Sequence, residues 1–261
     1  MGVRPNRVKA MLQRGEPVFG TMAATGWSGA PRAFQAAGLD FVLIENEHRT
    51  LGIETNQVLV AAARSLGLTS IVRVTDAEYH LVARTMDLGA DGVVVPRVES
   101  GQTAREAVSW VKFPPVGRRG FGIGPIVVDY EPLTIPQAIE HWNANSIVLM
   151  QVETRQGVEV VEEIASVPGV DAVVIGPADL SISLGIPGQT DDPLFREAVQ
   201  RVVTACAKAG VASGMFSGSL EAIAFWLARG MRWFSCRSDE DLVTQAAADL
   251  GRGLRGLSGA A

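Results

Sequence analysis

Acidic and amide side chains follow two short apolar segments in the middle of the chain. Gln151 and Glu153 come just after the apolar run 147–150, and Asp179 follows a second run at 172–175. Residues two apart on a strand point the same way, so Gln151 and Glu153 would share one face. Two acids at the ends of successive parallel strands suggest one site. Each acid could instead cap the N-terminus of a helix.

Further polar residues follow two earlier apolar segments. Glu45, Glu47 and His48 come after the run 41–44, and Arg73 lies near the end of the run 70–74. Carboxylates can hold a hard divalent cation with an oxyanionic ligand, an imidazole can act as a general base, and a fixed guanidinium can stabilise developing negative charge. For His48 the alternative is a hydrogen-bonded histidine that transfers no proton.

The order of the elements favours an α/β fold, a (β/α)₈ TIM barrel in one domain, 1–261. In such barrels catalytic residues lie at the C-terminal ends of the strands. No dinucleotide-binding glycine fingerprint follows the first strand, which counts against an open doubly wound sheet. Strands are expected at 18–22, 41–44, 70–74, 93–95, from 147, 172–175, 211–216 and 232–236, and helices at 6–14, 30–37, 53–65, 77–88, 103–112 and 242–250.

Composition excludes several classes of protein. The 261 residues are 47% hydrophobic, enough for a full core, and the net charge of -5 leaves no basic stripe for nucleic acid. No apolar run is long enough to span a bilayer and no signal-peptide core is present, so we expect a cytoplasmic protein that does not enter a membrane. Cys206 and Cys236 lack metal or redox spacing and are expected to be free thiols.

Six short motifs together resemble the HpcH/HpaI aldolases, metal-dependent class II enzymes that make or break a carbon–carbon bond next to a pyruvate unit. Each motif is weak alone, but six in the right order across nearly the whole chain are specific. They are Leu-Ile-Glu-Asn-Glu-His at 43–48, Val-Arg at 72–73, Asp-Leu-Gly at 87–89, Pro-Pro-Val-Gly-Arg-Arg-Gly at 114–120, Gln-Val-Glu-Thr-Arg at 151–155 and Gly-Pro-Ala-Asp-Leu-Ser at 176–181.

The resemblance implies a role for each matching residue. Glu153 and Asp179 would bind a divalent cation, Mg²⁺, Mn²⁺ or Co²⁺, and Gln151 would hold pyruvate oxygens. Arg73 would face the keto oxygen and stabilise the enolate. The base would be His48, acting directly or through water and oriented by Asp87.

Other residues would complete the substrate site. Phe216 ends the seventh strand, and the turn Gly176, Pro177 and Ala178 opens a helix whose free N–H groups could receive the pyruvate carboxylate. Glu45, Glu47 and Arg119 would support the site. Arg119 lies in the glycine- and proline-rich loop 113–135, where it would either reach substrate or pair with a surface acid.

This sequence departs from the family pattern at three places. Glu45 stands where an aspartate is usual, 124–127 replaces small and hydroxyl residues, and Cys236-Arg237-Ser238 replaces a glycine-containing turn. Arg237 would either face the pocket and select an acidic or polar acceptor, or form an ion pair outside it. The expected substrates are a 2-oxo acid and an aldehyde. Because family members exchange the last helix in hexamers, we expect a homohexamer or another homo-oligomer.

Each alternative function would require different residues. A Schiff-base aldolase needs a lysine at a strand end, but Lys9, Lys112 and Lys208 all fall in or at the ends of predicted helices. A phosphosugar enzyme would use the helix start after Ser217-Gly-Ser219. Decarboxylation of an oxaloacetate-like substrate would use the same enolate stabilisation. A barrel kept as a scaffold would leave the polar rim without a ligand.

Overall fold

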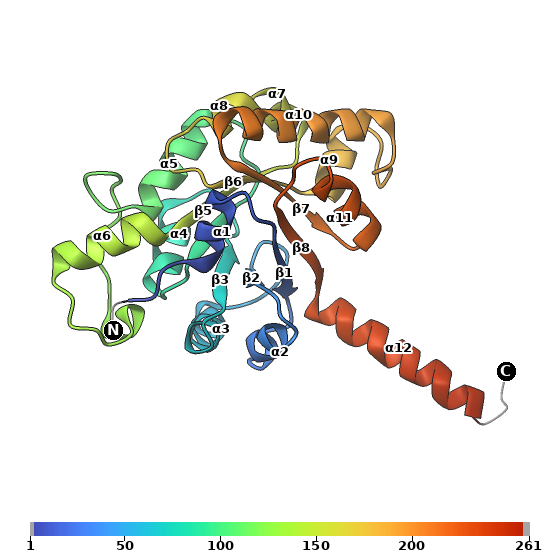
Figure 1. The fold of residues 1–261 in the computed structure, drawn as a ribbon, viewed down its shortest axis with the longest axis horizontal. Coiled ribbons are helices and arrows are strands. Elements are labelled where there is room, and N and C mark those ends of the chain that lie inside the picture. Colours follow the sequence, from blue (N-terminus) through green and yellow to red (C-terminus); the bar gives the residue numbers. More distant parts are fainter. Residues whose placement is uncertain (1–2, 258–261) are drawn as a thin grey trace.

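Eight parallel strands form a closed barrel in the computed structural model, which describes residues 3–257 (Figure 1). Each strand pairs with the next along the chain, and the last pairs with the first, so the predicted (β/α)₈ barrel is confirmed. The strands are β1 (Val18–Ala23), β2 (Phe41–Glu45), β3 (Thr69–Arg73), β4 (Gly92–Val95), β5 (Ile147–Val152), β6 (Ala172–Ile175), β7 (Ala212–Ser217) and β8 (Trp233–Ser238).

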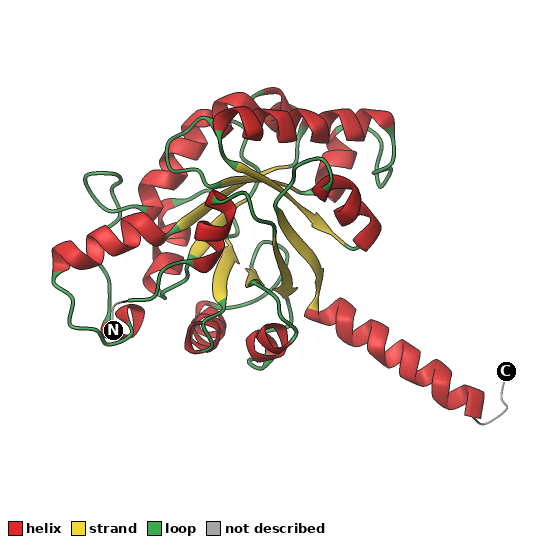
Figure 2. Cartoon of the chain, viewed as in Figure 1, coloured by secondary structure: helices red, strands yellow, loops and turns green. Residues whose placement is uncertain are grey.

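Helices surround the barrel and cover its outer apolar surface (Figure 2). Short apolar runs become strands buried on both faces because side chains fill the barrel on one side and helices pack on the other. The helices are α1 (Arg7–Gln13), α2 (Ala30–Ala36), α3 (Ile53–Ser65), α4 (Tyr79–Asp87), α5 (Gly101–Val111), the 3₁₀ helix η1 (Pro125–Val128), α6 (Ile135–Asn145), α7 (Arg155–Glu159), α8 (Val161–Ala165), α9 (Pro177–Ser183), α10 (Pro193–Ala209), α11 (Leu220–Leu227) and α12 (Asp239–Leu257).

Aromatic rings fill the interior of the barrel. Phe41 stacks on Trp233 with ring centroids 4.9 Å apart, and Phe216 meets Trp233 edge-on at 5.4 Å. A Cβ atom at Gly20 would collide with the Phe41 ring, so β1 needs glycine there. The packed interior leaves the strand ends as the place for a site.

The start of one predicted helix and the length of the last one differ from the observed helices. The helix expected at 77–88 is α4, which begins later, at Tyr79. The Asp76 carboxylate accepts the Ala77 N–H at 2.6 Å and thus orders the turn before the helix. The last helix is longer than the predicted 242–250 and extends away from the barrel (Figure 1). Asp239 is its only buried residue within the described part, so its apolar stripe has no intrachain cover.

The long loop between α5 and α6 contains η1, a short helix that its glycine and proline content did not predict. Asp129 and Tyr130 after it have positive φ angles of 54° and 59°. No helix among the described residues is long and apolar enough to cross a membrane.

Candidate active site

A pocket of about 280 Å³ opens at the C-terminal ends of the strands. Residues from β1, β3, β7 and β8, from α9 and α12, and from the loops that follow the strands line it. Eight of the predicted site residues share this pocket, namely His48, Arg73, Glu153, Gly176, Pro177, Ala178, Asp179 and Phe216.

Arg73 is the centre of a buried polar network at the floor of the pocket. Its Nε donates to Glu45 Oε2 at 2.7 Å, and its Nη1 donates to Gln151 Oε1 at 3.2 Å. Nη1 also lies 3.3 Å from Glu47 Oε2. The guanidinium stacks over the Phe216 ring, with Cζ 4.9 Å from the centroid. These four contacts fix the position of the Arg73 guanidinium and its positive charge.

Two carboxyl groups in this network have a raised pKa. Burial raises the pKa of Glu47, although Arg73 and His48 oppose the shift. Burial also raises the pKa of Glu153 to about 7, and the nearby acids Glu47 and Asp179 add to the shift. Gln151 Nε2 and the Arg97 N–H donate to Glu153 and partly compensate. The negative charge of these carboxylates exceeds the positive charge near them. An added cation would therefore stabilise their ionised forms.

The same residues offer a fit for a divalent cation. Glu47 Oε2 is buried without a hydrogen bond, and the Asp179 carboxylate forms no hydrogen bond or ion pair with any residue in 3–257. A Cβ at Gly176 would collide with Glu153 Oε2, so the glycine leaves space around that oxygen. The described residues contain no group of three or more His, Cys, Asp or Glu side chains arranged to hold a metal ion. Two carboxylates completed by water and substrate oxygens nevertheless suit Mg²⁺.

His48 lies at the mouth of the pocket, where its side chain is half-exposed. Its backbone N–H donates to Glu45 Oε1 at 3.0 Å, and its Nε2 lies 3.7 Å from Glu47 Oε1. Glu45 therefore contacts both Arg73 and the backbone of His48, and it fixes their relative position.

Asp87 and Arg119 lie together, outside the pocket. Arg119 Nη2 donates to Asp87 Oδ1 at 2.7 Å, while its guanidinium packs over Phe113 with Cζ 4.6 Å from the ring centroid. Because α4 runs antiparallel to the strands, its last residue Asp87 lies toward the opposite end of the barrel from His48. The described chain thus pairs Asp87 with Arg119 rather than with His48.

The segment 124–127 also lies away from this pocket. Gly124 and Pro125 line a separate cavity with Tyr130 and Ile135. Within one chain this segment therefore does not line the pocket that contains Arg73 and Glu153.

Sequence reasoning missed several residues that touch the site. Arg97 follows β4 with a positive φ of 53°, and its Nε lies 3.7 Å from Glu47 Oε1. Its position two residues after the end of β4 could have marked it as a site residue. Met22, Ser217, Gly218 and Asp241 also line the pocket.

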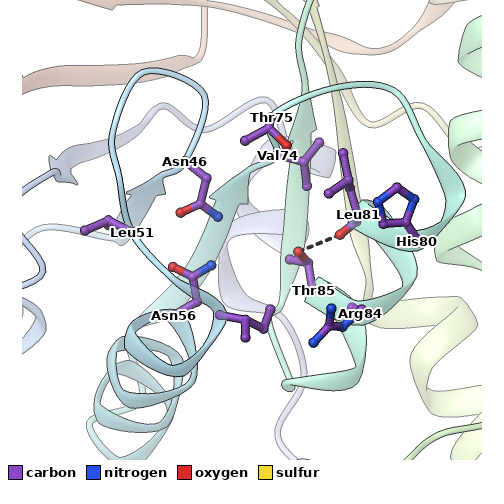
Figure 3. Close-up of a pocket in the computed structure, with 10 residues that line it drawn as sticks. Asn46, Leu51, Asn56, Val74, Thr75, His80, Leu81, Arg84 and Thr85 are labelled. Atoms are coloured by element: carbon purple, nitrogen blue, oxygen red, sulfur yellow. Dashed lines mark hydrogen bonds between the residues drawn. The ribbon is translucent and has the colours of Figure 1, made fainter.

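Asn46, between the two acids Glu45 and Glu47, points away from the pocket. It lines a second cavity of about 170 Å³ between α3 and α4, where its amide group faces that of Asn56 (Figure 3). Both Oδ1 atoms are buried and have no hydrogen-bond partner among the described residues. Strand alternation explains why Asn46 and its acidic neighbours face opposite ways.

A (β/α)₈ barrel with a buried guanidinium beside several carboxylates at its catalytic end defines an enzyme that can stabilise an anionic intermediate. Comparison with known proteins identifies the class of enzyme. The family described as "HpcH/HpaI aldolase/citrate lyase" matches residues 31–246. A hydroxypyruvate/pyruvate aldolase of Delftia acidovorans is 33% identical over 253 residues, 97% of this chain and 94% of the relative.

Two further proteins agree. A 2-dehydro-3,6-dideoxy-6-sulfogluconate aldolase of Pseudomonas putida is 32% identical over 94% of this chain and 96% of its own. The crystal structure of an HpcH/HpaI aldolase from Desulfitobacterium hafniense superposes with a TM-score of 0.91 at 31% identity, covering 97% of both chains. The chain belongs to the HpcH/HpaI aldolase/citrate lyase family and is a carbon–carbon lyase, a class II aldolase. This family generally depends on a divalent metal.

Proposed function

We propose that the chain catalyses the reversible cleavage of a 4-hydroxy-2-oxo acid to an aldehyde and pyruvate or a related 2-oxo acid. The observation that carries the proposal is the buried Arg73 guanidinium, which donates to Gln151 and lines one pocket with Glu153. Relatives named hydroxypyruvate/pyruvate aldolase and 4-hydroxy-2-oxo-heptane-1,7-dioate aldolase support this substrate class.

In the cleavage direction, His48 takes the proton of the C4 hydroxyl, directly or through water. The C3–C4 bond breaks, C4 leaves as the aldehyde carbon, and the electron pair passes to C3 to give an enolate. Arg73 faces the oxygen that becomes negative and stabilises it. A proton then adds to C3 and completes the 2-oxo acid.

Glu153 and Asp179 would hold a divalent cation, Mg²⁺, Mn²⁺ or Co²⁺, with Gln151 beside the 2-oxo acid. When bound, such a cation acts as a Lewis acid toward the carbonyl oxygen. Gly176, Pro177 and Ala178 start α9 and would contact the pyruvate carboxylate, while Phe216 supports Arg73 from below.

The phosphosugar alternative has less support from the geometry. Ser219 Oγ accepts the Ala222 N–H at 3.3 Å and so caps α11, and Ser217 Oγ donates to the Ser219 carbonyl at 3.1 Å. Both hydroxyl groups are therefore already hydrogen-bonded within the turn to which a phosphate would have to bind. Decarboxylation of an oxaloacetate-like acid would use Arg73 in the same way.

The experiment follows pyruvate in D₂O by proton NMR with the protein and Mg²⁺. Enolate formation exchanges the methyl protons, so the methyl signal should disappear without any aldehyde being present. A persistent methyl signal with Mg²⁺, Mn²⁺ and Co²⁺ each supplied in turn would refute the proposal. Release of carbon dioxide from oxaloacetate without cleavage of a 4-hydroxy-2-oxo acid would favour the decarboxylase.

We also propose a cytoplasmic homo-oligomer, a hexamer or another assembly. The exposed apolar side chains of α12, including Leu250, Leu254 and Leu257, support a contact between copies. The free thiols Cys206 and Cys236 are compatible with a reducing compartment. Light scattering of the purified chain would measure the assembly, and a monomeric mass at micromolar concentration would contradict it.

A further inference from the structure

Arg237 has an unusual backbone conformation at the edge of the pocket. It is the last residue but one of β8, and its φ of 59° is in the left-handed region. This region disfavours side chains with a Cβ atom and favours glycine. A residue held in such a conformation at a site calls for a functional reason.

The side chain of Arg237 lines the same pocket as Arg73, Glu153 and Asp179. Its Nε donates to the carbonyl of Gly218 at 3.2 Å, which ties the guanidinium to the loop after β7. This hydrogen bond uses one of the five N–H donors of the guanidinium. The N–H groups at Nη1 and Nη2 remain available to bind a ligand.

The acids that follow Arg237 in the chain, Glu240 and Asp241, have other partners. Asp241 Oδ2 accepts the Ser238 N–H at 2.9 Å and the Ser238 hydroxyl at 2.8 Å, at the start of α12. Glu240 pairs with Arg49 at 3.0 Å. Within residues 3–257, Arg237 forms no ion pair, so its charge remains available to a ligand in the pocket.

We propose that Arg237 selects an acceptor aldehyde that carries an anionic group, and this rests on the proposed aldolase function. Pyruvate would occupy the end of the pocket near Arg73, Glu153 and Asp179, which leaves the Arg237 edge for the aldehyde. A guanidinium fork binds a carboxylate, sulfonate or phosphate through two parallel hydrogen bonds. The anionic group stays unchanged while the aldehyde carbon joins C3 of pyruvate.

The test compares matched acceptors with pyruvate and Mg²⁺ in the wild type and in Arg237→Gln. The pairs are 4-oxobutanoate against butanal, and glyceraldehyde 3-phosphate against glyceraldehyde, so a carboxylate and a phosphate are distinguished. We expect kcat/KM of the wild type to favour the anionic member of at least one pair. The ratio should fall by about 5- to 20-fold in Arg237→Gln, mainly through KM, and recover in part in Arg237→Lys.

Two control variants distinguish this role from the general loss of one positive charge and from a change in the stability of the fold. Arg229→Gln removes an equal charge from an exposed arginine that follows α11 and does not line the pocket, and this variant should keep the wild-type ratio. Arg237→Gly relieves the left-handed strain, so its midpoint of thermal unfolding should stay within about 2 °C of the wild type. A much lower midpoint would instead make Arg237 a structural tie to Gly218 and overturn the proposal.

Equal ratios in the wild type and Arg237→Gln would also overturn it. Failure of the aldolase function itself gives a different result. In that case the wild type would not exchange the methyl protons of pyruvate, whatever the residue at position 237.

Discussion

Arg73 and Glu45 form a buried ion pair in which Arg73 Nε and Nη2 lie 2.7 Å and 2.6 Å from Glu45 Oε2. The other oxygen of Glu45 accepts the backbone N–H of His48 at 3.0 Å. One carboxylate therefore positions both the proposed oxyanion-stabilising cation and the proposed base. Removing its charge should disturb the chemistry more than shortening the side chain.

We expect Glu45→Gln to lower the rate of pyruvate methyl exchange by about 10- to 100-fold, because Arg73 loses the partner that aligns it. Glu45→Asp keeps the charge and should retain more of the rate. The exchange rate is measured by proton NMR in D₂O, with the exposed Glu54→Gln as control. Equal rates in Glu45→Gln and Glu45→Asp would show that the charge is not what positions Arg73.

Cation binding can be measured without activity. A ligand that binds only the folded protein stabilises it by about 2.7 kcal/mol at 100 times Kd. For a chain of this size Mg²⁺ or Mn²⁺ should therefore raise the midpoint of thermal unfolding by about 5 to 10 °C. The rise should vanish in Glu153→Gln and in Asp179→Asn.

Glu162→Gln serves as the matched control, because Glu162 pairs with Arg201 on the outer surface at 3.1 Å. Its midpoint should rise with metal as in the wild type. An equal rise in Glu153→Gln would place the cation elsewhere in the protein.

Much of this site follows from the chain order alone. The apolar runs that become β2, β3, β5 and β6 are short and buried on both faces, which a parallel barrel requires. Once the barrel is assigned, the residues after each strand must meet at one end. Glu47, Arg73 and Glu153 could be grouped from the sequence for this reason.

Loop paths and backbone strain could not be predicted in the same way. Arg119 reaches Asp87 through a loop with irregular geometry, which no periodicity encodes. The left-handed conformation of Arg237 depends on its tertiary contact with Gly218. The start of α4 at Tyr79 rather than at residue 77 is similar, because the Asp76 carboxylate accepts the Ala77 N–H and orders the turn before the helix.

His48 should contribute to proton transfer in the cleavage step. We expect His48→Ala to lower kcat for cleavage of a 4-hydroxy-2-oxo acid by about 10² to 10⁴, the usual contribution of a general base. The release of pyruvate in a coupled assay measures the rate. His80→Ala provides the control, since His80 lies on α4 and pairs with Glu78 at the surface. An unchanged kcat in His48→Ala would assign the base to another group.

Lys112 follows α5 at the end of the barrel opposite the pocket, consistent with the exclusion of a Schiff-base lysine. Its Nζ donates to the carbonyls of Asn143 and Ser146, both at 2.8 Å. Burial lowers the pKa of Lys112 to about 7, repulsion from Lys9 adds to this, and Asp171 opposes it. The ordinary pKa of a lysine is 10.5, so folding disfavours the proton of this ammonium.

Between pH 7 and 10.5 the unfolded chain binds more protons at Lys112 than the folded chain does, so the free energy of unfolding should rise with pH across this window. The cost of burying the ammonium is fully present below pH 7. We expect the stability of the wild type relative to Lys112→Met to increase by up to about 4 kcal/mol from pH 6.5 to 10. Urea unfolding at several pH values measures this difference. Lys208→Met, which removes an exposed lysine, should show no such trend, and a flat difference for Lys112→Met would mean that its ammonium stays charged in the folded protein.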